Sequence, residues 1–112
     1  MKRIARLLIT MLALILTAKI VPGIRIESIG AGFWATLILG LVNVFLKPIL
    51  TIFTLPLTIF SFGLFLFVIN GLMLLLTASM VNDFYVSGLL AAIFGSIILS
   101  IINSFMLDVL ND

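Results

Sequence analysis

The residues from Ile49 to Ser79 form an apolar run that contains no charged side chain. Comparable apolar runs lie on either side of it, at 7–18, 29–46 and 86–107. Hydrophobic residues make up 64% of the 112 positions and charged residues 9%, whereas a soluble domain has roughly half and about a quarter. Because so little polar surface is left to face water, we expect the solvent of this chain to be a lipid bilayer.

The apolar runs predict an all-α integral membrane protein, a single domain over residues 1–112 with four transmembrane helices at about 4–21, 30–53, 56–79 and 86–107. Pro48 removes a backbone donor and disfavours helical geometry at Lys47, so we expect the second helix to kink at Lys47-Pro48. Proline fits the first turn of a helix, which predicts a turn near Pro56. Residues 49–57 are very apolar for a loop, so a re-entrant hairpin there is an alternative.

The N-terminal segment combines basic residues with an apolar stretch that ends near Ala18, which is also how a secretory signal peptide begins. Apolar character resumes after Lys19, so we expect the segment to remain as the first span. Two aromatic pairs, Phe33-Trp34 and Phe84-Tyr85, follow polar breaks and suit the level of the lipid headgroups.

Lysine and arginine predict the orientation, because positively charged loops stay in the cytoplasm. If both termini are cytoplasmic, four basic residues lie inside and two lie outside, and both aromatic pairs lie at the outer interface. We therefore expect a multi-pass membrane protein with a cytoplasmic N-terminus and C-terminus. The inner set is Lys2, Arg3, Arg6 and Lys47, and the outer set is Lys19 and Arg25.

The chain contains no cysteine and no histidine, which removes disulfides, thiolate nucleophiles, imidazole bases and the commonest transition-metal ligands. We expect no catalytic residue, no cofactor and no metal, and hence no enzyme. The net charge of +2 is scattered along the chain, whereas nucleic-acid binding needs a clustered basic face. No nucleic-acid partner is expected.

Polar residues inside the predicted spans are the candidate functional residues. Asn43 and Lys47 share one face of the second span. In one interpretation both line a cavity. In the other, Asn43 hydrogen-bonds to a neighbouring helix and Lys47 extends its ammonium to the inner headgroups. Asn70 lies near the middle of the third span and shares a face with Thr77. An unpaired amide is costly in lipid, so Asn70 is expected to point into the bundle, as packing contact or as part of a site.

The fourth span carries small residues at steps of four, which predicts close packing between helices because small side chains let backbones approach. The partner is either another span of this chain or a second copy, and a serine-lined pore between copies is a further alternative. The face consists of Gly88, Ala92, Ser96, Ser100 and Ser104, together with Gly95 and Asn103.

Five short segments together form a recognisable pattern: Gly40-Leu41-Val42-Asn43, Lys47-Pro48-Ile49-Leu50, Leu55-Pro56-Leu57-Thr58, Gly63-Leu64-Phe65 and Phe67-Val68-Ile69-Asn70. With these segments, nearly the whole chain resembles the phage holin family, superfamily IV, a family of small bacterial four-span membrane proteins. The resemblance implies a retained first span and a location in the bacterial inner membrane. It also implies association of copies in the membrane and opening of lesions through which a cell-wall hydrolase passes.

Three functions follow as hypotheses. The first is a holin-like, self-associating or pore-forming protein with the bilayer and its own copies as partners. The second is a non-lytic structural or envelope-stress protein, or the membrane subunit of a larger complex with another membrane protein; the acidic residues Asp108 and Asp112, where many holins have a basic tail, favour it. The third is a small transporter whose site is made by Asn43, Lys47 and Asn70.

Overall fold

A computed structural model describes residues 2–111 of the chain, with the side chain of Asn111 left out. The described part consists of five helices and two short strands. The order along the chain is α1 (Lys2–Ile20), β1 (Ile24–Ile26), α2 (Ile29–Phe53), α3 (Leu55–Phe60), α4 (Phe65–Met80), β2 (Phe84–Val86) and α5 (Leu89–Asn111).

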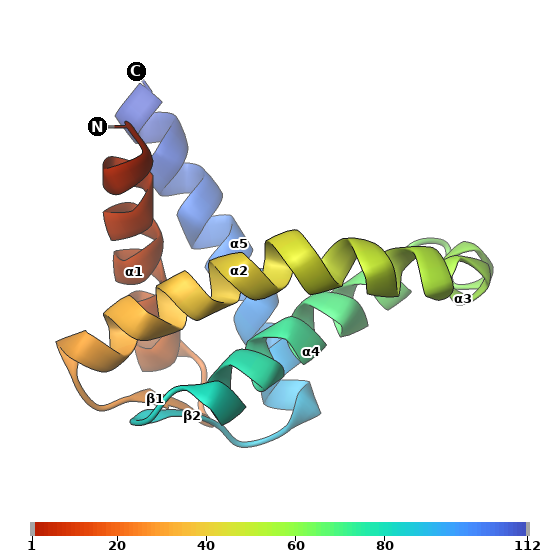
Figure 1. Cartoon of the computed structure of the whole chain (residues 1–112), viewed down its shortest axis with the longest axis horizontal. Helices are drawn as coiled ribbons and strands as arrows, with labels where there is room; N and C mark the ends of the chain where they lie inside the picture. Colours follow the sequence, from red (N-terminus) through yellow and green to blue (C-terminus); the bar gives the residue numbers. More distant parts are fainter. Residues whose placement is uncertain (1, 112) are drawn as a thin grey trace.

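The helices form two arms that diverge from the β-ribbon (Figure 1). The terminal arm consists of α1 packed along α5, and the central arm consists of α2 packed along α4, with α3 at its far end. Both chain termini lie at the free end of the terminal arm (Figure 1). The two arms therefore approach each other near the ribbon and separate away from it.

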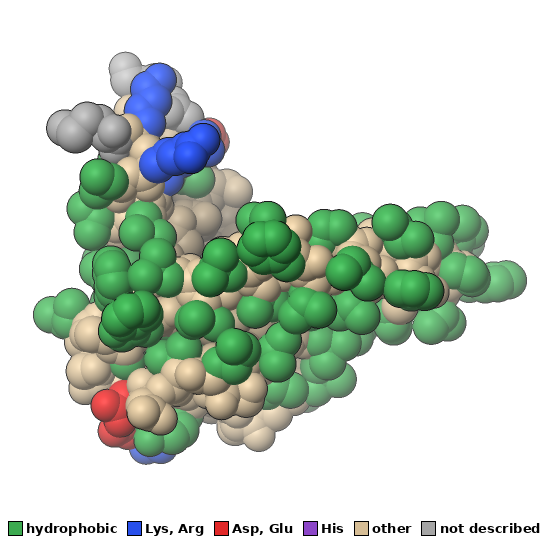
Figure 2. All heavy atoms as spheres, in the orientation of Figure 1, with side chains coloured by type: hydrophobic (Ala, Val, Ile, Leu, Met, Phe, Trp, Pro, Cys, Tyr) green, Lys and Arg blue, Asp and Glu red, His purple; other side chains and the backbone are tan. Residues whose placement is uncertain are grey.

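Two helices, α2 and α5, are long and apolar enough to cross a bilayer. At 1.5 Å per residue their 25 and 23 residues extend about 37 and 34 Å, against about 30 Å of hydrocarbon. Only 17% and 22% of their most apolar windows are buried, whereas the core helix of a soluble protein is mostly buried. Lipid is the solvent that suits such exposed apolar surface, and Figure 2 shows hydrophobic side chains over both arms.

The helices expected at 4–21 and 30–53 lie close to α1 and α2, whereas the helix expected at 86–107 is found at Leu89–Asn111, because Val86 still belongs to β2. The expected third helix is wrong in its bounds. Residues 49–53 continue α2 through Pro48 as one helix, without a hairpin. The helix expected from Pro56 to Ser79 is divided: α3 ends at Phe60 and α4 begins at Phe65.

The break is a Schellman turn. Phe62 has a positive φ of 57°, its N–H donates to the Ile59 carbonyl at 3.1 Å, and the N–H of Gly63 donates to the Thr58 carbonyl at 2.8 Å. The hydroxyl of Ser61 then accepts a hydrogen bond at 3.0 Å from the N–H of Phe65, the first residue of α4.

The two strands were not predicted from the sequence. They pair antiparallel, with Arg25 opposite Tyr85 at the centre of the register. The guanidinium of Arg25 lies 4.9 Å from the centre of the Tyr85 ring and 3.6 Å from the carboxylate of Glu27. A short ribbon thus closes one end of the helices and gathers charged groups there, as Figure 2 shows.

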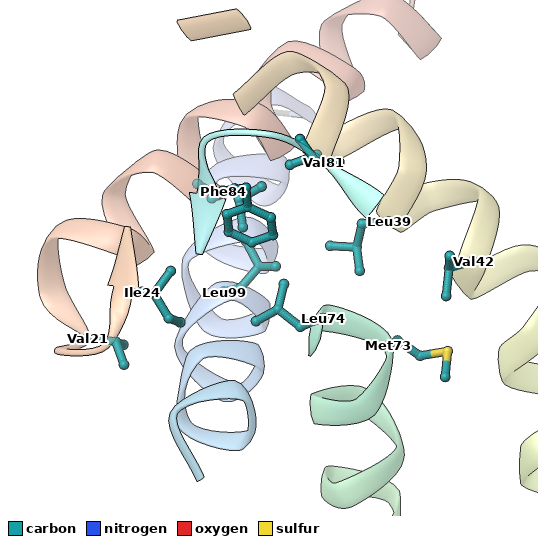
Figure 3. Close-up of a cluster of buried hydrophobic side chains, with 12 residues drawn as sticks. Val21, Ile24, Leu39, Val42, Met73, Leu74, Val81, Phe84 and Leu99 are labelled. Atoms are coloured by element: carbon teal, nitrogen blue, oxygen red, sulfur yellow. The ribbon is translucent and has the colours of Figure 1, made fainter. Parts of the chain in front are cut away.

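The hydrophobic core lies between the ribbon and the helices (Figure 3). Phe84 is its largest fully buried side chain, with 1% of its surface exposed, and it lies near Ile24, Leu74 and Leu99. The ring of Phe84 therefore packs inside the protein, and the level of the aromatic pair in the membrane stays a prediction. Strand alternation turns Phe84 inward and leaves Tyr85 exposed.

Candidate functional site

The fold is an internal repeat in which α1, β1 and α2 correspond to α4, β2 and α5 at an offset of 60 residues. The ribbon register is consistent with a two-fold axis through the Arg25–Tyr85 pair. Exchanging the halves at an offset of 60 residues turns the pair Ile24–Val86 into the pair Ile26–Phe84 and leaves Arg25–Tyr85 unchanged. The backbone bonds that flank the ribbon obey the same exchange: Ser87 N–H to the Gly23 carbonyl at 2.8 Å, and Glu27 N–H to the Asp83 carbonyl at 2.9 Å.

Side chains follow the repeat as well. Thr17 and Thr77 are both fully buried, and each hydroxyl donates to the carbonyl four residues earlier, at 2.7 and 2.9 Å. Gly23 and Asp83 both have positive φ, at 95° and 66°. The helices of the two halves interlock, because α1 packs along α5 and α2 along α4. Each arm therefore contains one helix from each half.

Polar residues from both halves meet at a cavity of about 110 Å³ between α2, α4 and α5. Leu39 and Leu99, which correspond to each other in the repeat, both line it, so the cavity lies beside the two-fold axis. Its polar lining consists of Asn43 and Lys47 from α2, Asn70 from α4, and Ser96 and Ser100 from α5. We call these five residues and the space they surround the polar cavity.

The polar cavity joins the candidate residues of the second and third spans to two serines of the fourth. Lys47 and Asn70 are half-buried, and Asn43 and Ser100 are exposed. Ser96 is buried and donates to the Ile93 carbonyl at 2.9 Å. The arrangement presents amide, ammonium and hydroxyl groups to one small space, which allows it to hold water or a small polar group by hydrogen bonds.

The other candidate residues lie elsewhere. Thr77 is engaged with its own helix backbone, as described above. Asn103 accepts a hydrogen bond from the Thr10 hydroxyl at 3.2 Å, which joins α5 to α1 within the terminal arm. Ser104 is exposed on α5. These three residues are therefore not part of the polar cavity.

The small-residue face of α5 is used in part by the chain itself. Ala92 is fully buried, and Gly95 lies against Ile24 and Leu74. Gly88 is half-buried just before the helix, where its carbonyl accepts the first hydrogen bond from Ala92. The first half of the face therefore packs within this chain, whereas Ser100 and Ser104 further along it are exposed.

Sequence reasoning missed Thr10 and Gly71. In the repeat, Thr10 corresponds to Asn70, and Asn103 corresponds to Asn43. The hydrogen bond between Thr10 and Asn103 therefore lies at the position in the terminal arm that is equivalent to the two asparagines of the polar cavity. Aligning the sequence with itself at an offset of 60 residues is the signal that finds this correspondence. Gly71 lies against the backbone of α5, a contact that no sequence pattern marks.

Comparison with known proteins finds related membrane proteins. Residues 1–105 match the family described as the mycobacterial four-span phage holin, superfamily IV. The chain is 48% identical to the uncharacterized membrane protein YvlD of Bacillus subtilis over 96 residues, which cover 85% of this chain and 81% of that protein.

A second relative, the uncharacterized protein SCO3922 of Streptomyces coelicolor, is 42% identical over 80 residues, which cover 64% of each chain. No solved structure matches the chain. The match over residues 1–105 and the extent of the first similarity show that the chain belongs to the phage holin family, superfamily IV.

Proposed function

We propose that the protein is a self-associating, holin-like protein of the bacterial inner membrane, in which several copies surround a polar-lined opening. The observation that carries this proposal is the exposure of polar groups in the single chain. Asn43 and Ser100 border the polar cavity and are both exposed. Hydrocarbon offers such groups no hydrogen bonds, so another copy or water has to cover them.

The exposed part of the α5 face supports association between copies. Small residues allow close approach of helices, and Ser100 and Ser104 remain free of the packing that covers Ala92 and Gly95. The proposed activity is permeability and includes no catalysis. Family membership supports the same direction, since the family is named for phage holins.

We also propose that the helices cross the membrane four times with both termini in the cytoplasm. The termini lie at the same end of the terminal arm, and Lys and Arg side chains gather there in Figure 2. The ribbon lies at the opposite end of the helices (Figure 1). In the proposed topology the ribbon lies at the outer surface and the basic N-terminal residues lie inside, in keeping with the positive-inside rule.

Single cysteine variants test this orientation, because the native chain has no thiol. Asn82→Cys, exposed beside the ribbon, should react with a membrane-impermeant maleimide in intact cells, whereas Arg3→Cys should react only after lysis. Gel shifts of the labelled protein measure both. Labelling of Arg3→Cys alone in intact cells would reverse the proposed topology.

Permeability has its own test. Inducible expression of the native protein should collapse the membrane potential, followed with a potential-sensitive dye. Ser100→Leu, which fills the exposed edge of the polar cavity with an apolar side chain, should reduce the rate of collapse about tenfold or more. Ile101→Leu is the matched control on the next residue, 62% exposed and outside the cavity, and should behave as the native protein.

A steady potential at high expression of the native protein would contradict pore formation. It would favour the second candidate, a non-lytic structural or envelope-stress protein or a membrane subunit of a larger complex. The packed core at the ribbon end supports that alternative. Phe84, Leu14 and Leu74 are almost fully buried there, so the single chain is closed at the end opposite its termini.

A further inference from the structure

The polar cavity differs from its counterpart in the terminal arm in one respect. In the terminal arm the Thr10 hydroxyl and the Asn103 amide bond to each other at 3.2 Å. In the central arm, the equivalent residues Asn70 and Asn43 have no hydrogen bond to any side chain or carbonyl of residues 2–111. The repeat thus contains one polar pair whose side chains hydrogen-bond to each other and one equivalent pair whose side chains do not. The second pair, Asn43 and Asn70, borders the polar cavity.

Charge breaks the symmetry in the same place. Lys47 lines the polar cavity, whereas its counterpart in the second half is Leu107. Within the described part of the chain Lys47 has no carboxylate partner, because the one ion pair found there joins Arg25 and Glu27. No acidic residue lines the polar cavity. The site is therefore cationic, rich in hydrogen-bond donors and present once in each chain.

An unpaired cation near hydrocarbon is unfavourable, and an anion that accepts several hydrogen bonds offsets this cost. Lys47 supplies an ammonium with three donors, Asn43 and Asn70 supply amide N–H groups, and Ser100 supplies a hydroxyl. The tetrahedral oxygens of a phosphate group suit donors that converge from three helices, and lysine binds phosphate as a point charge. A volume of about 110 Å³ suits one such group, whereas sites for larger metabolites measure about 300 Å³ or more.

We infer that the polar cavity binds a phosphate group through Lys47, Asn43 and Asn70. Lys47 lies six residues before the end of α2, in the second half of that helix, whereas the strand β1 directly precedes the first half. In the proposed topology, a phosphate group reaches this level from two sources, the headgroup of a phospholipid in the adjacent leaflet or inorganic phosphate in the cytoplasm. Binding at this site does not depend on pore formation, so the two proposals fail independently.

Purified full-length protein in a non-ionic maltoside detergent tests this inference. Phosphatidylglycerol is added in one arm, with bound lipid counted by native mass spectrometry, and diacylglycerol with the same acyl chains serves as the phosphate-free control. Inorganic phosphate is titrated by calorimetry in the other arm. Saturable binding of one phosphatidylglycerol per chain identifies a lipid headgroup, and saturable binding of inorganic phosphate identifies the free anion; either result supports the site.

Lys47→Met should weaken the observed binding about tenfold or more, because it removes the charged donor. Lys19→Met changes the same charge at an exposed position outside the polar cavity and should bind as the native protein does. Lys47→Arg should retain most of the binding, which separates loss of charge from loss of fold. Two results would overturn the inference. One is equal affinity of the native protein, Lys47→Met and Lys19→Met in both binding experiments. The other is equal retention of diacylglycerol and phosphatidylglycerol together with no binding of inorganic phosphate.

Discussion

Phe84→Ala should lower the free energy of unfolding by about 3–5 kcal/mol, the range for removing a buried aromatic ring from a packed core. Phe84 is 1% exposed and belongs to the cluster that holds the ribbon against the helices. It is contributed by the three-residue strand β2, so few other side chains of its own element can replace the contact. We expect the loss to appear in equilibrium unfolding by a denaturing detergent, monitored by helical circular dichroism.

Phe105→Ala provides the matched control, since the same ring is removed from an α5 position that is 68% exposed. There the ring faces lipid or another copy, and its loss should change stability by less than about 1 kcal/mol. Similar losses for the two variants would show that Phe84 is not a core residue. Such a result would also remove the basis for placing the ribbon against the bundle.

Gly71→Val should destabilise the protein by about 1–3 kcal/mol or more through forced separation of α4 and α5. A Cβ atom at Gly71 would lie 2.8 Å from Cγ1 of Ile93, 3.0 Å from its backbone nitrogen and 3.1 Å from its Cα. A side chain could rotate away, but the backbone of α5 cannot move without shifting the whole helix. The rate of proteolysis in detergent and the unfolding midpoint both measure the effect.

Gly40→Val is the control for this prediction. It makes the same substitution within a helix, at a position where a Cβ atom would meet nothing within 4 Å. Any general effect of a β-branched residue on helix stability applies to both variants, so their difference reports the helix contact. If Gly40→Val is as unstable as Gly71→Val, then close packing of α4 on α5 is not the cause.

The sequence by itself determined the lipid environment and most helix positions. A backbone in lipid finds no water, so its N–H and C=O groups have to hydrogen-bond to each other. A helix makes all of these hydrogen bonds within one apolar segment. The helix predicted at 30–53 is therefore found as Ile29–Phe53. The repeat is also written in the sequence, for example in Thr17 and Thr77 and in Asn43 and Asn103, although it is visible only when the two halves are aligned.

Local backbone geometry explains the largest error in the predicted helix boundaries, the division of the third helix. Ser61-Phe62-Gly63 reads as a continuation of an apolar helix, yet Phe62 adopts a positive φ and ends α3. A non-glycine residue rarely occupies this region, so composition favours the unbroken helix. The hydrogen bonds of the turn, together with the hydrogen bond from the Phe65 N–H to the Ser61 hydroxyl, stabilise the broken helix.

The tertiary structure alone decided which polar groups meet. Helical periodicity places Asn43 and Lys47 on one face of α2, but it does not say which helix that face approaches. Pairing of the strands brings the two halves into register, and Asn70, Ser96 and Ser100 then join them at the polar cavity while Asn103 is bonded to Thr10. Hydropathy measures how apolar a segment is, whereas contacts between helices depend on direction and distance, which only the assembled fold specifies.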